Sequence, residues 1–198
     1  MKILSIDPSL TGTAFALLEI QEGHLLSVET FFVDNSKNAK EGTGFRLLQI
    51  SNKLSWLLEQ NQVDHVAIEK QFTRFNVATQ AMFRVIGTIE LALAQHGLFE
   101  IEYITPTSVK KEITGDGKAT KEQVQEAVRV YLPKEQKNME FLTNDCSDAV
   151  AIGVVLGLNK KFLKKFKTDV TNQKSPVEKK MKGDKPSKQN KPKRKVKQ

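Results

Sequence analysis

The sequence predicts an α/β fold in which a mixed five-stranded sheet is flanked by helices. Three apolar runs of strand length come first, and further short strands then alternate with segments of helical periodicity. In addition, acidic residues follow directly after two of the predicted strands. These acids are expected on one rim of the sheet, where α/β folds commonly bind ligands.

The first three predicted strands form a hairpin and a third neighbouring strand. Residues 2–6 are a short apolar run that contains the β-branched Ile3 and Ile6. Pro8 ends this strand because it has no N–H to donate, and the turn follows at residues 9–12. The next two strands are predicted at residues 13–20 and 24–33.

Helices and strands alternate along the rest of the predicted domain. Residues 34–44 are polar and lack periodicity, so we expect a loop there. Strands are expected at residues 66–68 and 101–104, and Pro106 ends the second of them. Thr120 is the expected N-cap of the third helix. The predicted helices are residues 45–60, 76–95, 121–131 and 149–158.

Two acids occupy equivalent places at predicted strand ends. Asp7 follows the first strand and Glu69 follows the fourth. Each acid alone could simply solvate a strand end. Two further acids, Asp145 and Asp148, precede an almost wholly apolar run and lie on one face of the first turn of its helix. The helix dipole also favours acids there, and Thr143 or Asn144 can cap the helix.

Four acids on three separated elements have little reason to meet unless cations hold them together. Mg²⁺ prefers carboxylate oxygens and substrate phosphates, and a pair of such ions is the natural candidate. The sequence therefore predicts metal-dependent cleavage of a phosphodiester.

Four segments resemble those of the RuvC family of Holliday-junction resolvases, within the RNase H-like superfamily. They occur in the family's order and at roughly its spacing: IDPSLTG, IEKQF, TPTSVKKEITGDGKATKEQV and DCSDAVAIG. The resemblance covers about residues 1–158 and implies an RNase H-like fold. The family's catalytic and metal-binding tetrad falls on Asp7, Glu69, Asp145 and Asp148. We expect two Mg²⁺ ions per site, replaceable by Mn²⁺, with Asp7 as the shared ligand.

The resemblance also implies DNA-contacting residues. The aromatic residue that wedges at the junction centre falls on Phe72, and two DNA-contacting lysines fall on Lys110 and Lys121. Further basic residues in the same segments are expected to hold the flanking DNA backbone. The predicted DNA-binding set is Phe72, Arg74, Lys110, Lys111, Lys118 and Lys121. Residues 114–120 lack Walker A spacing, so no nucleotide cofactor is predicted.

The net charge of +8 is unevenly distributed along the 198 residues. Residues 160–198 carry 16 Lys/Arg against 3 Asp/Glu, whereas residues 1–159 carry 15 against 20. The predicted domains are therefore a nuclease domain at residues 1–158 and a lysine-rich tail at residues 159–198, too polar to form a core and expected to be disordered. The stretch KPKRKV at residues 191–196 resembles a nuclear localisation signal, but nonspecific attachment to DNA is the preferred interpretation.

The remaining composition narrows the cellular setting. Cys146 is the only cysteine, which excludes an internal disulfide. No apolar run has the length of a membrane helix and no signal peptide is recognised, so a cytoplasmic location in a bacterial or phage-infected cell is expected.

The predicted function is a Mg²⁺-dependent endonuclease that resolves four-way DNA junctions by paired nicking. The resemblance implies a homodimer and 5′-phosphate products, and the helix at residues 76–95 is the candidate interface. One alternative is a branched nucleic-acid-binding protein of the same fold without junction-specific cleavage, and another is a broader flap or fork nuclease. A phosphotransferase of the actin and sugar-kinase type shares the Asp-x-x-x-Thr-Gly turn, but that fold needs two such domains.

Overall fold

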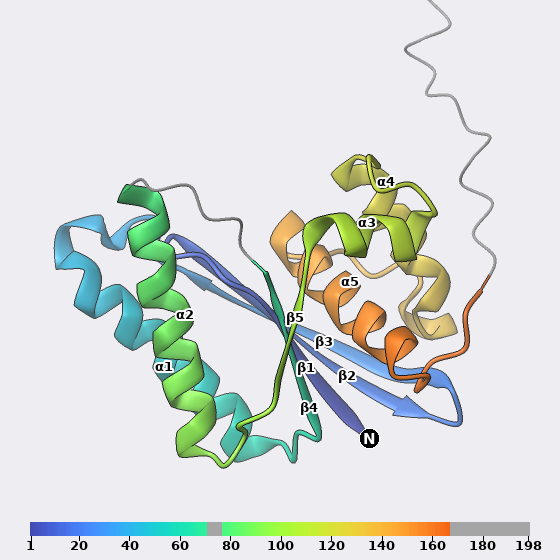
Figure 1. The fold of residues 1–198 in the computed structure, drawn as a ribbon, viewed down its shortest axis with the longest axis horizontal. Helices are drawn as coiled ribbons and strands as arrows, with labels where there is room; N and C mark the ends of the chain where they lie inside the picture. The colour runs from blue at the N-terminus through green and yellow to red at the C-terminus, as the bar shows by residue number, and fades with distance from the viewer. Residues whose placement is uncertain (71–76, 167–198) are drawn as a thin grey trace, which may run out of the picture.

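The computed structural model describes residues 1–70 and 77–166 (Figure 1). The predictions for Phe72 and Arg74, and those for the lysine-rich tail from residue 167 onward, lie outside the described residues.

The five strands form one mixed sheet, as the sequence predicts. The central strand β1 pairs antiparallel with β2, which pairs antiparallel with β3, while β4 and β5 add in parallel on the other side of β1. The order across the sheet is β3-β2-β1-β4-β5. The strands are β1 (Lys2–Asp7), β2 (Gly12–Gln21), β3 (His24–Asp34), β4 (His65–Glu69) and β5 (Ile101–Ile104).

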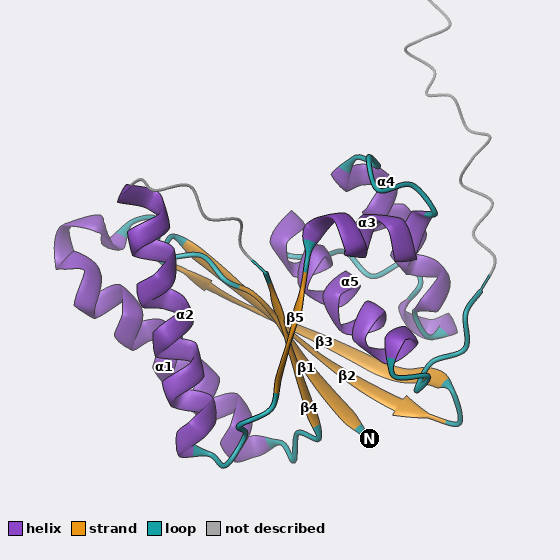
Figure 2. Ribbon diagram, in the orientation of Figure 1, coloured by secondary structure: helices purple, strands orange, loops and turns teal. Residues whose placement is uncertain are grey.

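Helices cover both faces of the sheet (Figures 1 and 2). On one face lie α1 (Gly42–Gln60) and α2 (Val77–Gln95). On the other lie α3 (Pro106–Thr114), α4 (Lys121–Val128) and α5 (Asn144–Asn159). A hydrophobic core lies on each face of the sheet, and successive residues of β1 point into opposite cores. Ile3 packs in the core under α5, and Leu4 packs in the core under α1 and α2. Burial on both faces explains why Ile3, Leu4 and Ile6 are apolar, whichever face of β1 they occupy.

Helix α5 packs closely against β1 and β2. A Cβ atom at Gly153 would lie 2.7 Å from both the Leu18 Cδ1 and the Ser5 Oγ, so only glycine permits this approach. The Ser5 hydroxyl donates a 2.7 Å hydrogen bond to the Ala149 carbonyl. These contacts set the position of the α5 N-terminus relative to the end of β1.

The structure corrects the predicted helices in several places. Helix α3 was missing from the sequence-based prediction, in which Pro106 only ends a strand. Thr105 caps α3 by accepting a hydrogen bond from the Ser108 N–H, and Pro106 stands at the helix start, where its missing N–H costs nothing. Helix α1 begins at Gly42 rather than residue 45, after the 3₁₀ turn Asn38–Glu41 in the expected loop. Helix α4 ends at Val128, and the 3₁₀ turn Arg129–Tyr131 follows.

Packing continues beyond the end of α5. Leu163 is buried next to Gly157, and the Lys164 N–H donates a 2.9 Å hydrogen bond to the Gly23 carbonyl. Phe166 contacts the ring of Tyr131 edge-on. The boundary at residues 158/159 stays a prediction, and residues 160–166 pack on the folded body formed by the preceding residues. Within the described ranges, no helix is long and apolar enough to cross a membrane.

Candidate active site

Two carboxylates lie side by side at the ends of neighbouring parallel strands. Asp7 is the last residue of β1, and Glu69 is the last residue of β4. The parallel register pairs Ile6 with Ile68. The next residues, Asp7 and Glu69, therefore lie at the same edge of the sheet. The sequence prediction that these two acids share one rim is therefore confirmed.

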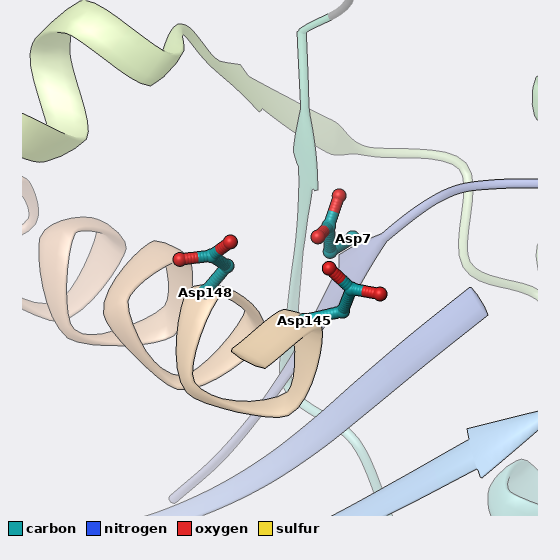
Figure 3. A group of neighbouring side chains, drawn as sticks. All are labelled: Asp7, Asp145 and Asp148. Atoms are coloured by element: carbon teal, nitrogen blue, oxygen red, sulfur yellow. The ribbon is translucent and has the colours of Figure 1, made fainter. Parts of the chain in front are cut away.

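The first turn of α5 brings two further acids to this rim. Thr143 is the N-cap of α5, and its hydroxyl accepts a hydrogen bond from the Cys146 N–H. The cap fixes the start of α5 beside the end of β1. Asp145 and Asp148 project from that turn toward Asp7 (Figure 3). One carboxylate oxygen from each of these three residues lies within 4.8 Å of the other two. A hard cation with bonds of about 2.1 Å closes such a spacing with small side-chain rotations.

Glu69 has a different position in the site. It lies outside the group of three mutually close carboxylates formed by Asp7, Asp145 and Asp148, but it lines the same pocket. Its negative charge also helps to raise the pKa of Asp7. All four predicted acids therefore face one pocket, and three of them are within reach of a single ion.

The site concentrates negative charge around a partly buried carboxyl group. Burial, together with repulsion from Glu69, Asp148 and Asp145, raises the pKa of Asp7 to about 8. Lys121 opposes this rise. A group of ionised carboxylates at this spacing is unfavourable without a compensating cation. The donor set consists only of hard oxygen ligands and fits a divalent ion such as Mg²⁺.

The acids form the floor of an open pocket of about 440 Å³. Helix α3 supplies Val109 and Lys110 to one wall, and α4 supplies Lys121 and Val124. Ser9, which is predicted only as a turn residue, also lines the pocket. Its turn is held by Thr13, whose hydroxyl donates a 2.6 Å hydrogen bond to the Ser9 carbonyl.

The predicted lysines divide into two groups. Lys110 and Lys121 line the pocket beside the acids. Lys111 and Lys118 are exposed and are not among the residues that line this pocket. Lys121 pairs with the acids: its Nζ lies 2.8 Å from the Asp148 Oδ2 and 3.8 Å from the Asp145 Oδ1. The hydrogen bond to Asp148 is the main cause of the raised pKa of Lys121.

Sheet order and the acidic rim together define a mixed α/β protein with a candidate metal site at the end of its central strand. The chain belongs to the RuvC family. The model of that family, described as crossover junction endodeoxyribonuclease RuvC, matches residues 3–156.

Curated relatives with this description extend over most of the chain. The RuvC of Prochlorococcus marinus is 32% identical over 154 residues, which cover 78% of this chain and 94% of the relative. The RuvC of Campylobacter jejuni is 33% identical over 165 residues, which cover 80% of this chain and 97% of the relative.

Solved structures show the same fold. The RuvC structure of Thermus thermophilus matches with a TM-score of 0.64 at 24% identity, covering 84% of this chain and 100% of that one. The same protein in complex with a Holliday junction substrate matches with a TM-score of 0.66 at 23% identity, covering 81% and 95%. The RNase H-like fold predicted from the sequence is therefore confirmed.

Proposed function

We infer that this protein is a crossover junction endodeoxyribonuclease that resolves four-way DNA junctions. Family membership supports the substrate class, and the curated relatives carry that activity in their names. The observation that carries the inference is the group formed by Asp7, Asp145 and Asp148, with one oxygen of each within 4.8 Å of the others. It lies in an open pocket whose wall carries two lysines.

A divalent metal follows from the family and from the all-carboxylate donor set, and we propose Mg²⁺, two ions per site, with Mn²⁺ able to substitute. Asp7 would be the shared ligand, Glu69 would serve one ion, and Asp145 and Asp148 would serve the other or both. Such ions lower the pKa of an attacking water and neutralise charge on the leaving 3′ oxygen. The products would carry 5′-phosphate ends.

The protein's own charges would orient the DNA around this centre. Lys110 and Lys121 stand on the pocket wall, where their ammonium groups can reach phosphates flanking the scissile bond. Lys111 and Lys118, exposed outside the pocket, would contact the backbone further along the arms. The proposed wedge residue Phe72 and its neighbour Arg74 follow the strand that delivers Glu69.

A homodimer would supply two active sites to one junction, and α2 is the proposed interface. Two large apolar side chains on one face of α2 are exposed: Phe83 by 56% and Leu91 by 62%. Gly87 lies midway between them, and a Cβ atom there would meet nothing within 4 Å. Residues at this i, i+4, i+8 spacing form one stripe. A second copy of α2 packed on that stripe would bury the two apolar side chains and pair opposed sites for paired nicking.

A cleavage assay tests the proposed function. The full chain is incubated with a synthetic four-way junction, a flap, a fork and a linear duplex of matched sequence, with Mg²⁺ or with chelator. We expect paired nicks in the junction only when Mg²⁺ is present, with products that DNA ligase can seal.

The same assay separates the alternatives. Binding to the junction without nicking under any metal would favour a structural DNA-binding protein. Equal cleavage of flaps and forks would favour a broader branch nuclease.

A further inference from the structure

The Lys121 ammonium group pairs with two of the acids that a metal ion would also bind. Its Nζ donates a 2.8 Å hydrogen bond to the Asp148 Oδ2 and lies 3.8 Å from the Asp145 Oδ1. Both acids belong to the group of carboxylates that could hold a metal ion. The lysine therefore partly neutralises the acids, and it uses at least one of the oxygens available for coordination.

The two partners differ in their freedom to move. The Asp148 side chain is only 19% exposed, whereas that of Lys121 is 60% exposed. The Lys121 backbone is held at the start of α4 by the capping box of Thr120 and Gln123. Displacing the ammonium group thus requires only rotation of a flexible four-carbon side chain. Since Lys121 also lines the pocket, the released ammonium stays close to any phosphate bound there.

A divalent ion and the Lys121 ammonium compete for the same negative charge. The ion carries twice the charge and can bind several carboxylates at once, so it would displace the Lys121 ammonium from its partly exposed ion pair. DNA phosphate then offers the lysine a new anionic partner. The affinities for the metal and for DNA must change each other by the same factor, because linkage is reciprocal.

We propose that Lys121 is a displaceable counter-ion of the acidic site: it holds Asp148 in the metal-free protein, and metal binding releases it to a DNA phosphate. Lys121 is thus a positioning residue that makes metal binding and DNA binding cooperative. The proposal rests on the proposed function, because it assumes that the acids bind a divalent ion and that the pocket binds DNA.

Lys110 offers a matched control. It carries the same charge and lines the same pocket. Among the described residues, no ion pair joins it to an acid. Removing Lys110 therefore reports the general electrostatic effect of one fewer positive charge. Removing Lys121 has the same effect and also removes the side chain that competes with the metal ion for the acids.

The first measurement is Ca²⁺ binding by calorimetry to the full-length protein without DNA. We expect Lys121→Met to bind Ca²⁺ about fivefold more tightly than wild type, the factor that a partly exposed ion pair is worth. Lys110→Met should change the affinity less, and Lys121→Arg should remain close to wild type. In wild type, acylation of the Lys121 amine, read by peptide mass spectrometry, should speed up when Ca²⁺ saturates the site.

The second measurement is four-way junction binding with and without Ca²⁺. Calcium should raise the junction affinity of wild type and of Lys110→Met, and raise that of Lys121→Met by a smaller factor. Equal gains in all three proteins would overturn the release of Lys121 to DNA. A Ca²⁺ affinity of Lys121→Met no higher than that of Lys110→Met would overturn the competition.

The Mg²⁺-dependent cleavage assay on wild type distinguishes failure of the counter-ion role from failure of the proposed function. If wild type nicks the junction but Lys121→Met shows no gain in Ca²⁺ affinity, only the counter-ion role is wrong. If wild type neither binds a divalent ion nor nicks the junction, the proposed function and this inference both fail.

Discussion

The Ser5 hydroxyl donates a 2.7 Å hydrogen bond to the Ala149 carbonyl and so ties the central strand to helix α5 next to the acidic site. Ser5 lies two residues before Asp7 on the same face of β1, and Ala149 directly follows Asp148. This contact therefore helps to set the distance between the carboxylates of β1 and those of α5.

Replacing Ser5 by alanine should weaken both the fold and the site. The Ser5 hydroxyl is fully buried, so Ser5→Ala leaves the Ala149 carbonyl without this donor and should cost about 1 kcal/mol of unfolding free energy. Urea denaturation measures the loss, and junction nicking should slow because α5 is less firmly held. Ser27→Ala is the control: its hydroxyl bonds Glu19 in a less buried setting, so its cost should stay below about 0.5 kcal/mol.

Neutralising the acids should abolish nicking but leave junction binding. Asp7→Asn, Glu69→Gln, Asp145→Asn and Asp148→Asn each remove a ligand charge and keep the side-chain shape. In metal-free buffer, junction binding should even tighten, because repulsion between these acids and phosphate is relieved. Parallel gel-shift and nicking assays measure both effects. Near-normal cleavage by any two of these variants would contradict the assignment of the four acids.

Stability of the metal-free protein should fall as the pH rises, and Asp7 should be a main cause. Burial and neighbouring acids raise its pKa from 3.8 to about 8 in the folded state. Between these values the folded protein retains a proton that the unfolded chain has lost, so the free energy of unfolding decreases with increasing pH. Urea denaturation at pH 5 and pH 8 with chelator should show a smaller drop for Asp7→Asn than for wild type.

A divalent ion should reverse this pH effect. Metal that binds only the folded state stabilises it, and an aspartate that serves as a ligand binds metal in its ionised form. Saturating Mg²⁺ should therefore raise the stability of wild type most at pH 8 and that of Asp7→Asn much less. Equal stabilisation of the two proteins by Mg²⁺ would contradict Asp7 as a ligand.

Phe72→Ala should slow cleavage of the junction far more than it weakens binding. A base stacked on an aromatic ring contributes roughly 1–3 kcal/mol, and the stack would form mainly at the distorted crossover. A thermal melting curve must accompany the activity assay. If Phe72 belongs to the core instead, the variant would lose about 3–5 kcal/mol of stability, and the wedge role would be refuted.

Deleting residues 168–198 should weaken DNA binding without unfolding the protein. Described packing extends to Phe166, which contacts Tyr131, so the deletion keeps these contacts and should leave the melting temperature almost unchanged. Each lost lysine–phosphate contact should flatten the slope of log affinity against log salt by roughly 0.9. Linear duplex should lose more affinity than the junction. An unchanged salt slope would instead favour a nuclear-import or protein-partner role for the tail.

The sequence alone predicted the strands and the rim on which Asp7 and Glu69 lie. This was possible because the apolar runs show which segments are buried, and strand direction then decides where the next residue emerges. Helix α3 was missed because a proline after a strand ends that strand and can also begin a helix. Thr105 as a cap before Pro106 was the available signal for α3, and it would have placed Lys110 on a helix.

Only the tertiary structure decided which charges meet. Lys121 and Asp148 are 27 residues apart and pair because α4 packs against α5. Similarly, the 4.8 Å grouping of Asp7 with Asp145 and Asp148 depends on the close packing that Gly153 allows between α5 and β1. Local sequence determines which face of an element a side chain occupies. The distance between two elements depends on the packing of all the side chains between them, and no single segment contains that information.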